Sequence, residues 1–207
     1  MNLPSVTGHI LNSVLRLKMQ FCEIDDLANE SDVEQKLLWP LLTSERPLGL
    51  GFSAAEVQTK PNLRDLAIDK GTSKKIYRPD FAIIQSGLPM AVGEAKKPGE
   101  SLIEAKREAR LYAAEVNALY KTEFNPCRYV FACDGRHLIF SKWDSTIPFA
   151  ELKFDDIIPT NPKFADLVAI IGKTALTNEA DALLRSLTND ADMFRREHPC
   201  FRLVQFL

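Results

Sequence analysis

The sequence predicts an α/β protein in which a central mixed β-sheet is flanked by helices. An amphipathic helical pattern comes first, two strand patterns joined by a turn follow, and a long helix then precedes a second strand pair. Helices and strands in this order build one sheet with helices on its faces. At 207 residues and 45% hydrophobic composition, the chain can bury a substantial core. Its length favours one domain, or one domain with an appendage.

The first expected element is an amphipathic helix that begins at Ser31. Serine is a favoured N-cap residue, and apolar side chains recur at helical spacing over residues 33–42, with a disturbance expected near Pro40. Glu34 lies three residues after Ser31, which is the spacing of a capping box, so capping is one interpretation of this carboxylate. After a glycine-containing loop, a strand is expected around residues 54–59.

Two strand patterns follow, over residues 76–84 and 90–96, and a turn containing Gly and Pro joins them. Because side chains alternate along a strand, Glu94 and Lys96 point the same way, and the neighbouring strand can present Asp80 on that face. Asp80 falls within the first pattern, where Asp is disfavoured, so function is favoured over a turn. Apolar neighbours of Glu94 and Lys96 indicate a buried strand, which favours an active site over a surface ion pair.

A long helix comes next, because Ser101 and Glu104 have the capping-box spacing and an Ala-containing apolar stripe continues to about Leu119. Asp134-Gly135 then indicates a two-residue hairpin turn between two strands. The remaining expected elements are strands over residues 128–133, 136–141 and 149–154 and helices over residues 164–171 and 178–196.

We expect the chain to contain two regions. Residues 1–160 would form the domain that carries the sheet, and residues 161–207 would form a helical C-terminal extension. This extension would pack on the first region, or lead to a further domain or partner. Residues 200–207 are apolar for a chain end, so we expect this tail to dock, to meet a partner, or to continue into another domain.

Composition limits the location of the protein and the kinds of site it carries. No run of about 18 apolar residues occurs, and residues 1–20 lack the features of a secretory signal, so we expect a cytoplasmic protein with no membrane partner. The four Cys and three His residues are scattered, so neither a zinc site nor a disulfide framework is indicated. Gly172-Lys173-Thr174 is not a phosphate loop, because Leu167 stands where that loop needs Gly, and no nucleotide site is expected.

The distribution of charge favours an anionic partner. The net charge is −2, yet residues 60–121 contain twelve Lys and Arg against eight acids, so this window carries +4 and the remainder −6. A positive surface of this kind attracts phosphates, although a solvated helix face with loop lysines is the alternative interpretation. A nucleic acid is therefore a candidate partner.

Asp80, Glu94 and Lys96 together suit phosphodiester hydrolysis. That reaction needs neutralisation of a phosphate oxygen, activation of water and stabilisation of a leaving alkoxide, which Mg²⁺ held by carboxylates supplies. We predict Asp80 as the bridging ligand, with Glu94 and the backbone carbonyl of Ala95 as further ligands. Lys96 is predicted to orient or deprotonate the attacking water and to offset charge on phosphorus. Mn²⁺ is considered as a substitute for Mg²⁺.

Pro79-Asp80 and Glu94-Ala95-Lys96 on a hairpin resemble the site of the PD-(D/E)XK nuclease superfamily. Over residues 31–142 the chain also resembles the N-terminal nuclease domain of type I restriction enzyme R subunits. This resemblance rests on the helix with Glu34, the Arg-Pro-Asp-Phe and Gly-Leu-Pro-Met-Ala-Val-Gly-Glu-Ala-Lys segments, the Ala/Tyr helix and the Phe-Ala-Cys-Asp-Gly hairpin. The resemblance implies a restriction-endonuclease-like fold and a Mg²⁺-dependent DNA endonuclease. It implies catalytic roles for Asp80, Glu94 and Lys96, a metal-ligand role for Glu34, and other restriction or defence subunits as partners.

Many relatives also carry a Gln and a Tyr four residues apart on the helix after the catalytic strand. The equivalent positions here are Glu108 and Tyr112, and a carboxylate would repel DNA phosphate where an amide would not. Core packing is an alternative role for Tyr112. The residues expected to contact DNA are Lys74, Lys75, Arg78, Lys97, Lys106, Arg107, Arg110 and Tyr112. The alternative function is a nucleic-acid-binding or assembly module on the same fold that does not cleave unaided.

Overall fold

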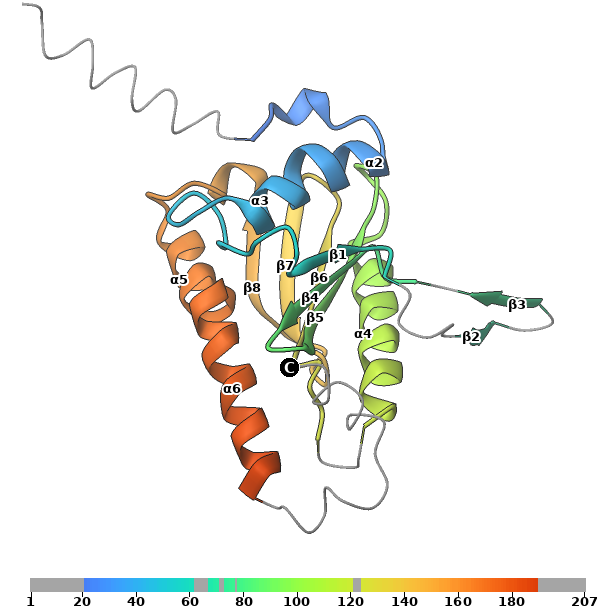
Figure 1. The fold of residues 1–207 in the computed structure, drawn as a ribbon. Coiled ribbons are helices and arrows are strands. Elements are labelled where there is room, and N and C mark those ends of the chain that lie inside the picture. The colour runs from blue at the N-terminus through green and yellow to red at the C-terminus, as the bar shows by residue number, and fades with distance from the viewer. Residues whose placement is uncertain (1–20, 62–66, 71–72, 77, 121–123, 190–207) are drawn as a thin grey trace, which may run out of the picture.

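A six-stranded mixed sheet forms the centre of the protein in a computed structural model, which describes residues 21–61, 67–70, 73–76, 78–120 and 124–189 (Figure 1). The strand order is β1-β4-β5-β6-β7-β8, and only the β5–β6 pair is parallel among these strands. The strands are β1 (Val57–Thr59), β4 (Phe81–Gln85), β5 (Leu88–Ala95), β6 (Tyr129–Cys133), β7 (His137–Lys142) and β8 (Pro148–Lys153). A separate two-stranded sheet consists of β2 (Ala67–Lys70) and β3 (Ser73–Ile76).

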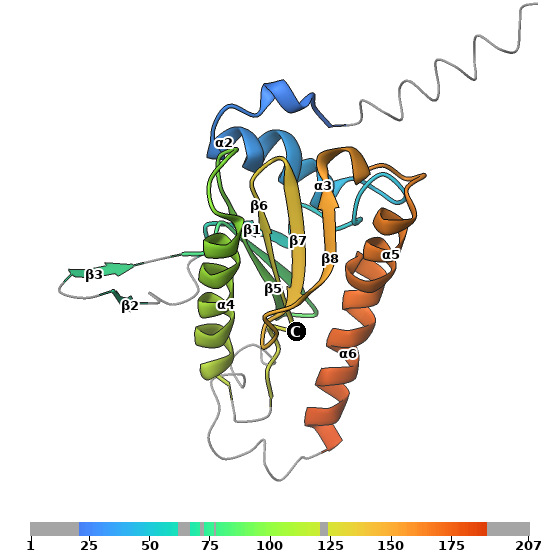
Figure 2. The same cartoon turned by 180° about the vertical axis from the view of Figure 1, so that it is seen from behind.

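Helices cover both faces of the main sheet, as the two opposite views show (Figures 1 and 2). Helix α4 (Leu102–Ala118) connects the parallel strands β5 and β6 and packs on both. On the other face, α5 (Pro162–Ile171) contacts β8, and α6 (Lys173–Asn189) contacts β4 and β5. The predicted α/β class with a central mixed sheet flanked by helices is therefore confirmed.

Two apolar clusters occupy the two faces of the sheet. The cluster under α4 is built from small residues on the helix, such as Ala109 and Ala113, against Val92 and Val130 on the strands. These alanines let the helix lie close to the sheet. The larger cluster on the opposite face holds the leading helix, α5 and α6 against the strands. Its fully buried members include Phe52, Phe81, Phe131, Phe140, Phe164, Leu37, Leu38, Leu41 and Leu42.

The C-terminal helices belong to the same core as the sheet. Leu176 and Ala180 of α6 are fully buried in the larger cluster. Polar contacts also fasten α6 to the β4–β5 turn, because Ser86 Oγ donates to Asp181 Oδ1 at 2.6 Å and Thr177 Oγ1 to Gln85 Oε1 at 2.7 Å. The described part of the predicted extension thus packs on the sheet. Its helix α6 begins before the predicted residue 178, and the apolar tail lies outside the described residues.

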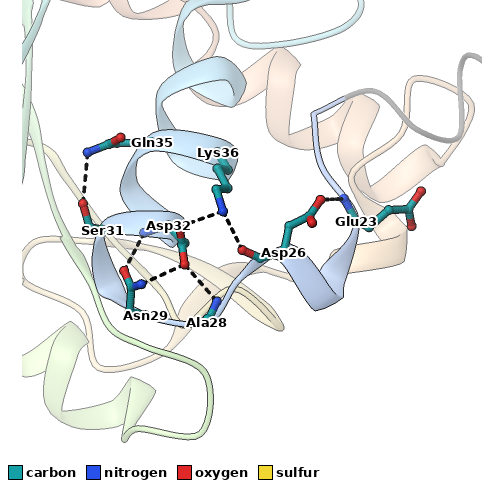
Figure 3. A network of polar contacts seen from close by, with 8 residues as sticks. All are labelled: Glu23, Asp26, Ala28, Asn29, Ser31, Asp32, Gln35 and Lys36. Atoms are coloured by element: carbon teal, nitrogen blue, oxygen red, sulfur yellow. Dashed lines mark hydrogen bonds and ion pairs between the residues drawn. The ribbon is translucent and has the colours of Figure 1, made fainter.

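The leading helix begins earlier than the sequence pattern indicated. It starts with α2 (Glu30–Asp32), and its N-cap is Asn29, whose side chain accepts from the Asp32 N–H at 3.0 Å. Asp32 Oδ2 in turn accepts from the Ala28 N–H at 3.1 Å, while Ser31 Oγ accepts from Gln35 (Figure 3). The predicted capping by Ser31 and Glu34 is therefore wrong. Asn29 and Asp32 supply the same three-residue spacing two residues earlier.

The disturbance expected near Pro40 is confirmed as a π-helical segment, Val33–Leu38, between α2 and α3 (Trp39–Thr43). Here the Trp39 N–H bonds to the Glu34 carbonyl, five residues back. Proline has no N–H, and its ring crowds the carbonyl four residues before it. The wider turn ahead of Pro40 is a way to accommodate that ring without ending the helix.

The predicted strand over residues 76–84 is interrupted. The strand β3 ends at Ile76 and β4 begins at Phe81, so Asp80 stands immediately before a strand and its predicted position within one is wrong. Pro79 accounts for the break, because proline cannot donate to a strand ladder. The Asp80 carbonyl still accepts a hydrogen bond from the Lys60 N–H at 2.8 Å, which ties this residue to the end of β1.

Both predicted hairpins are confirmed, as is the start of the long helix. Ser86 and Gly87 form the first turn with positive φ angles of 50° and 78°, which match a type I′ turn. In the second turn, Asp134 Oδ1 accepts from the N–H groups of Arg136 and of His137, the first residue of β7. Ser101 caps α4 by accepting from the Glu104 N–H at 3.3 Å.

None of the helices in the described part of the chain combines the length and the apolar content that crossing a membrane requires.

Candidate active site

Asp80, Glu94 and Lys96 lie at one end of the β4–β5 pair, on the face that α4 covers. Phe81 pairs with Gly93, so the next cross-strand neighbours toward this end are Asp80 and Glu94. Alternation puts Glu94 on the same face as Val92, which packs under α4. The two carboxyl groups are largely buried, with exposed fractions of 8% for Asp80 and 4% for Glu94. The predicted sharing of one face is therefore observed.

Close packing on the opposite face holds β5 in position. A β-carbon on Gly93 would overlap the ring of Phe131, the residue paired with Gly93 on β6. Only glycine leaves room for this aromatic ring between the strand and the larger apolar cluster. The position of Glu94, the next residue along β5, thus depends on a glycine contact with the core.

Each of the three side chains has a defined polar partner. The Ala95 N–H donates to Asp80 Oδ2 at 2.8 Å, which orients that carboxyl group. Lys96 Nζ lies 3.3 Å from Glu94 Oε2 and 3.0 Å from Glu108 Oε2 on α4. The second oxygen of Glu94, Oε1, is buried and has no hydrogen-bond partner among the residues that the structure describes. An orphaned carboxylate oxygen of this kind is costly unless a cation or proton satisfies it.

Burial dominates the protonation of the two acids. It raises the pKa of Asp80 to about 6, partly offset by the Ala95 hydrogen bond and reinforced by the Glu34 and Glu30 carboxylates. Burial also raises the pKa of Glu94 to about 9, and the neighbouring Asp80 charge adds to that increase. Without a metal ion, Glu94 therefore keeps its proton at neutral pH.

Lys96 is held in its charged form. Burial disfavours the ammonium, but the hydrogen bond to Glu108 and the charge of that carboxylate outweigh it, so the pKa of Lys96 lies above its ordinary value. A lysine with a raised pKa is a poor proton acceptor at neutral pH. The arrangement favours Lys96 as a cationic donor over its other predicted role, the deprotonation of water.

A second group of carboxylates meets at Asp80. Oxygen atoms of Glu30, Glu34 and Asp80 all lie within 4.8 Å of one another, and we call these three residues the acid cluster. Glu34, predicted from the family resemblance, is thus brought to Asp80. Glu30 was not predicted, although its spacing of four from Glu34 places both on one helix face. That spacing was the signal available in the sequence.

Mg²⁺ fits the chemistry of these donors. Carboxylate oxygens are its preferred protein ligands, and the acid cluster concentrates three of them beside the buried Glu94. Glu94 is not a member of the acid cluster, and its orphaned Oε1 lies on the neighbouring strand β5. Ala95 contacts the site through its N–H group, which donates to Asp80 Oδ2. A ligand role for its carbonyl stays a prediction.

Five of the seven basic residues expected to contact DNA fall into two groups, and Lys74 and Lys75 belong to neither. Arg78, Lys97 and Arg107 are exposed, and the latter two form surface ion pairs with Glu100 and Glu104 at 3.3 and 3.1 Å. Such exposed pairs are weak and can exchange partners. Contact of these three residues with DNA stays a prediction.

The second group is tied to the protein itself. Lys106 Nζ donates to the Thr146 carbonyl at 2.6 Å, and Arg110 Nε donates to the Trp143 carbonyl at 3.0 Å, which fastens α4 to the loop after β7. Tyr112 is 3% exposed and packs in the cluster under α4, as its alternative core role requires. Lys74 and Lys75 lie in β3 of the separate two-stranded sheet.

The fold and the arrangement of Asp80, Glu94 and Lys96 define a class of protein: an α/β domain of the restriction-endonuclease-like fold, as in PD-(D/E)XK nucleases. Residues 28–144 match the family described as type I restriction enzyme R protein N terminus. This match spans more than half of the chain, and the chain belongs to that family. No curated protein and no solved structure matches it.

Proposed function

We propose that this protein is a metal-dependent DNA endonuclease domain that hydrolyses phosphodiester bonds, like the nuclease domain of type I restriction R subunits. The observation that carries the proposal is the meeting of Asp80 with Glu94, Lys96 and the helix carboxylates at one end of the sheet. Family membership supports DNA as the substrate and other restriction subunits as partners.

Asp80 and the helix acids Glu34 and Glu30 would hold the metal ion, with Glu94 completing the site. When bound, Mg²⁺ would supply positive charge against the phosphate oxygens and assist the loss of a proton from water. The Ala95 N–H holds one oxygen of Asp80, and the other oxygen would bind the metal ion. Because a metal ligand must be deprotonated, binding at Glu94 would release the proton that burial retains there.

Lys96 would act as a charged hydrogen-bond donor in the reaction. Its ammonium is positioned from two sides by Glu94 and Glu108, at 3.3 and 3.0 Å. A cation held this way can orient a water molecule and offset the negative charge that develops on phosphorus. The carboxylate at Glu108, where relatives carry Gln, thus has a role as the counter-ion of Lys96.

Cleavage of DNA by the purified protein tests this proposal. Supercoiled and linear DNA are incubated with Mg²⁺ or Mn²⁺ and with the wild type, Asp80→Ala or Lys96→Ala, while Lys142→Ala, at an exposed position on β7, is the matched control. We expect metal-dependent nicking by the wild type and the control alone. Nicking that survives loss of Asp80 or Lys96 contradicts the assigned site.

A non-cleaving binding or assembly module on the same fold is the second candidate. The pairing of Lys96 with Glu108 favours it, because a lysine held by Glu94 and by the Glu108 carboxylate has less freedom to meet a substrate. Binding without cutting, with either metal and with partner subunits supplied, supports this second function. Binding by either candidate should weaken steeply with salt, since it depends on phosphate contacts.

A further inference from the structure

Lys60 lies at the end of β1 and contacts the acid cluster in two ways. Its backbone N–H donates to the Asp80 carbonyl at 2.8 Å. Its ammonium lies 3.3 Å from Glu34 Oε1. One residue from outside the motif is thus bound to two members of the acid cluster.

The backbone at Lys60 has an unusual conformation. Its φ angle is +45°, in the left-handed region that non-glycine residues adopt uncommonly. Such a conformation persists when the surrounding contacts hold it, and it is found often at functional sites. Here the hydrogen bond to Asp80 holds the backbone, and the side chain reaches Glu34.

The ammonium of Lys60 is positioned to be displaced. The Lys60 side chain is 59% exposed, whereas the Glu34 side chain that it contacts is 13% exposed. Lys96, the other cation near the site, is 21% exposed and pairs with Glu94 and Glu108. Among the ion pairs of the described residues, Lys60 is therefore the cation that pairs with the helix carboxylate Glu34. Because the Lys60 side chain is exposed, its ammonium can move away from Glu34 without opening the core.

We propose that Lys60 is the displaceable counter-ion of the acid cluster, which a divalent metal ion must move away from Glu34 in order to bind. This inference rests on the metal site of the proposed function. Three carboxylates within 4.8 Å repel one another, and one ammonium relieves part of that repulsion. A metal ion brings two charges to the same oxygens, so Lys60 and the metal compete for Glu34. Lys60 thereby sets how tightly the site holds metal.

Metal affinity measured on the full chain tests this role without reference to catalysis. Binding of Mn²⁺ alone is measured by calorimetry for the wild type, Lys60→Gln, Lys60→Arg and Lys36→Gln. Lys36 is a matched control, because its ammonium pairs with Asp32 at 2.8 Å on the same helix, outside the acid cluster, and its side chain is also exposed. The two Gln variants therefore remove the same charge at similar positions.

We expect Lys60→Gln to bind Mn²⁺ about fivefold more tightly, because removal of one competing positive charge at contact distance is worth on the order of 1 kcal/mol. Lys60→Arg, which keeps the charge, and Lys36→Gln should both stay within about twofold of the wild type on the same scale. Unchanged or weaker binding by Lys60→Gln overturns the proposal. Thermal unfolding of each variant checks that it is folded.

Chemical labelling of amines gives an independent measurement. Addition of Mn²⁺ should increase the rate of Lys60 labelling, followed by mass spectrometry, and leave Lys36 unchanged. Protection of Lys60, or no change at it while metal binds, overturns the proposal. If neither the wild type nor Lys60→Gln binds Mn²⁺, the metal site and the proposed function fail together. If both bind with equal affinity, only the role of Lys60 fails.

Discussion

Replacement of Glu94 by Gln should stabilise the metal-free protein while it abolishes metal-dependent cleavage. Burial raises the pKa of Glu94 from an ordinary 4.5 to about 9. As the pH rises, the unfolded chain therefore releases this proton before the folded protein does. Folding stability is unaffected by Glu94 below about pH 4.5 and falls progressively up to about pH 9.

The cost of Glu94 to the free energy of folding follows from the size of its pKa shift. Each pKa unit corresponds to about 1.4 kcal/mol, so retention of the proton at pH 7 costs about 3 kcal/mol relative to a residue that does not titrate. Gln is close in shape to protonated Glu, and its carbonyl can accept from Lys96. We expect Glu94→Gln to recover about half of the cost, because its amide remains buried and polar.

Urea unfolding in the presence of a metal chelator, at pH 5, 7 and 8.5, measures this effect. The stability gain of Glu94→Gln should be small at pH 5 and should grow as the pH rises. Glu151→Gln, on the exposed side of β8, is the matched control and should follow the wild type at every pH. A stability difference between Glu94→Gln and the wild type that does not change with pH would refute the assigned burial of a protonated Glu94.

Three further substitutions test other contacts. Glu108→Gln should bind a DNA duplex several-fold more tightly, as measured by fluorescence anisotropy, because it removes a carboxylate beside Lys96. Glu104→Gln removes the same charge one turn earlier on α4 and should have less effect. Equal effects of the two substitutions would contradict a local role for Glu108. Gly93→Ala should destabilise the protein by about 3 kcal/mol or more, because its β-carbon would overlap Phe131, and a wild-type melting temperature would disprove that contact. Asn29→Ala should cost about 1 kcal/mol in urea unfolding through loss of the helix cap, and no loss would show that Asn29 does not cap.

Local sequence patterns predicted most of the strands and helices that build the site. Asp134-Gly135 and the Ser101 cap mark their turn and helix start correctly, because a turn and a cap depend on a few neighbouring residues. The local pattern at Ser31 was misleading, because Asn29 caps the helix instead. Two residues with similar capping ability compete there, and the packing of the helix on the sheet selects between them.

The alternation of side chains along a strand predicted part of the candidate site. Glu94 and Lys96 share a face because they are two residues apart. Asp80 comes opposite Glu94 only through the register shift between Ile83 and Ile84, because the turn at Ser86 and Gly87 alone would place it opposite Gly93. Glu30 was accessible through its spacing of four from Glu34, yet two acids on one helix face are common at protein surfaces. Their proximity to Asp80 distinguishes them here.

Short-range periodicity was enough to predict from the sequence the α/β order of elements, the β4–β5 hairpin and the shared face of Glu94 and Lys96. Which charged side chains meet depends instead on tertiary packing. Lys60 reaches Glu34, and Lys96 reaches Glu108, each across two different elements of the fold. Those distances depend on how the core holds the leading helix and α4 against the sheet, and no local pattern encodes them.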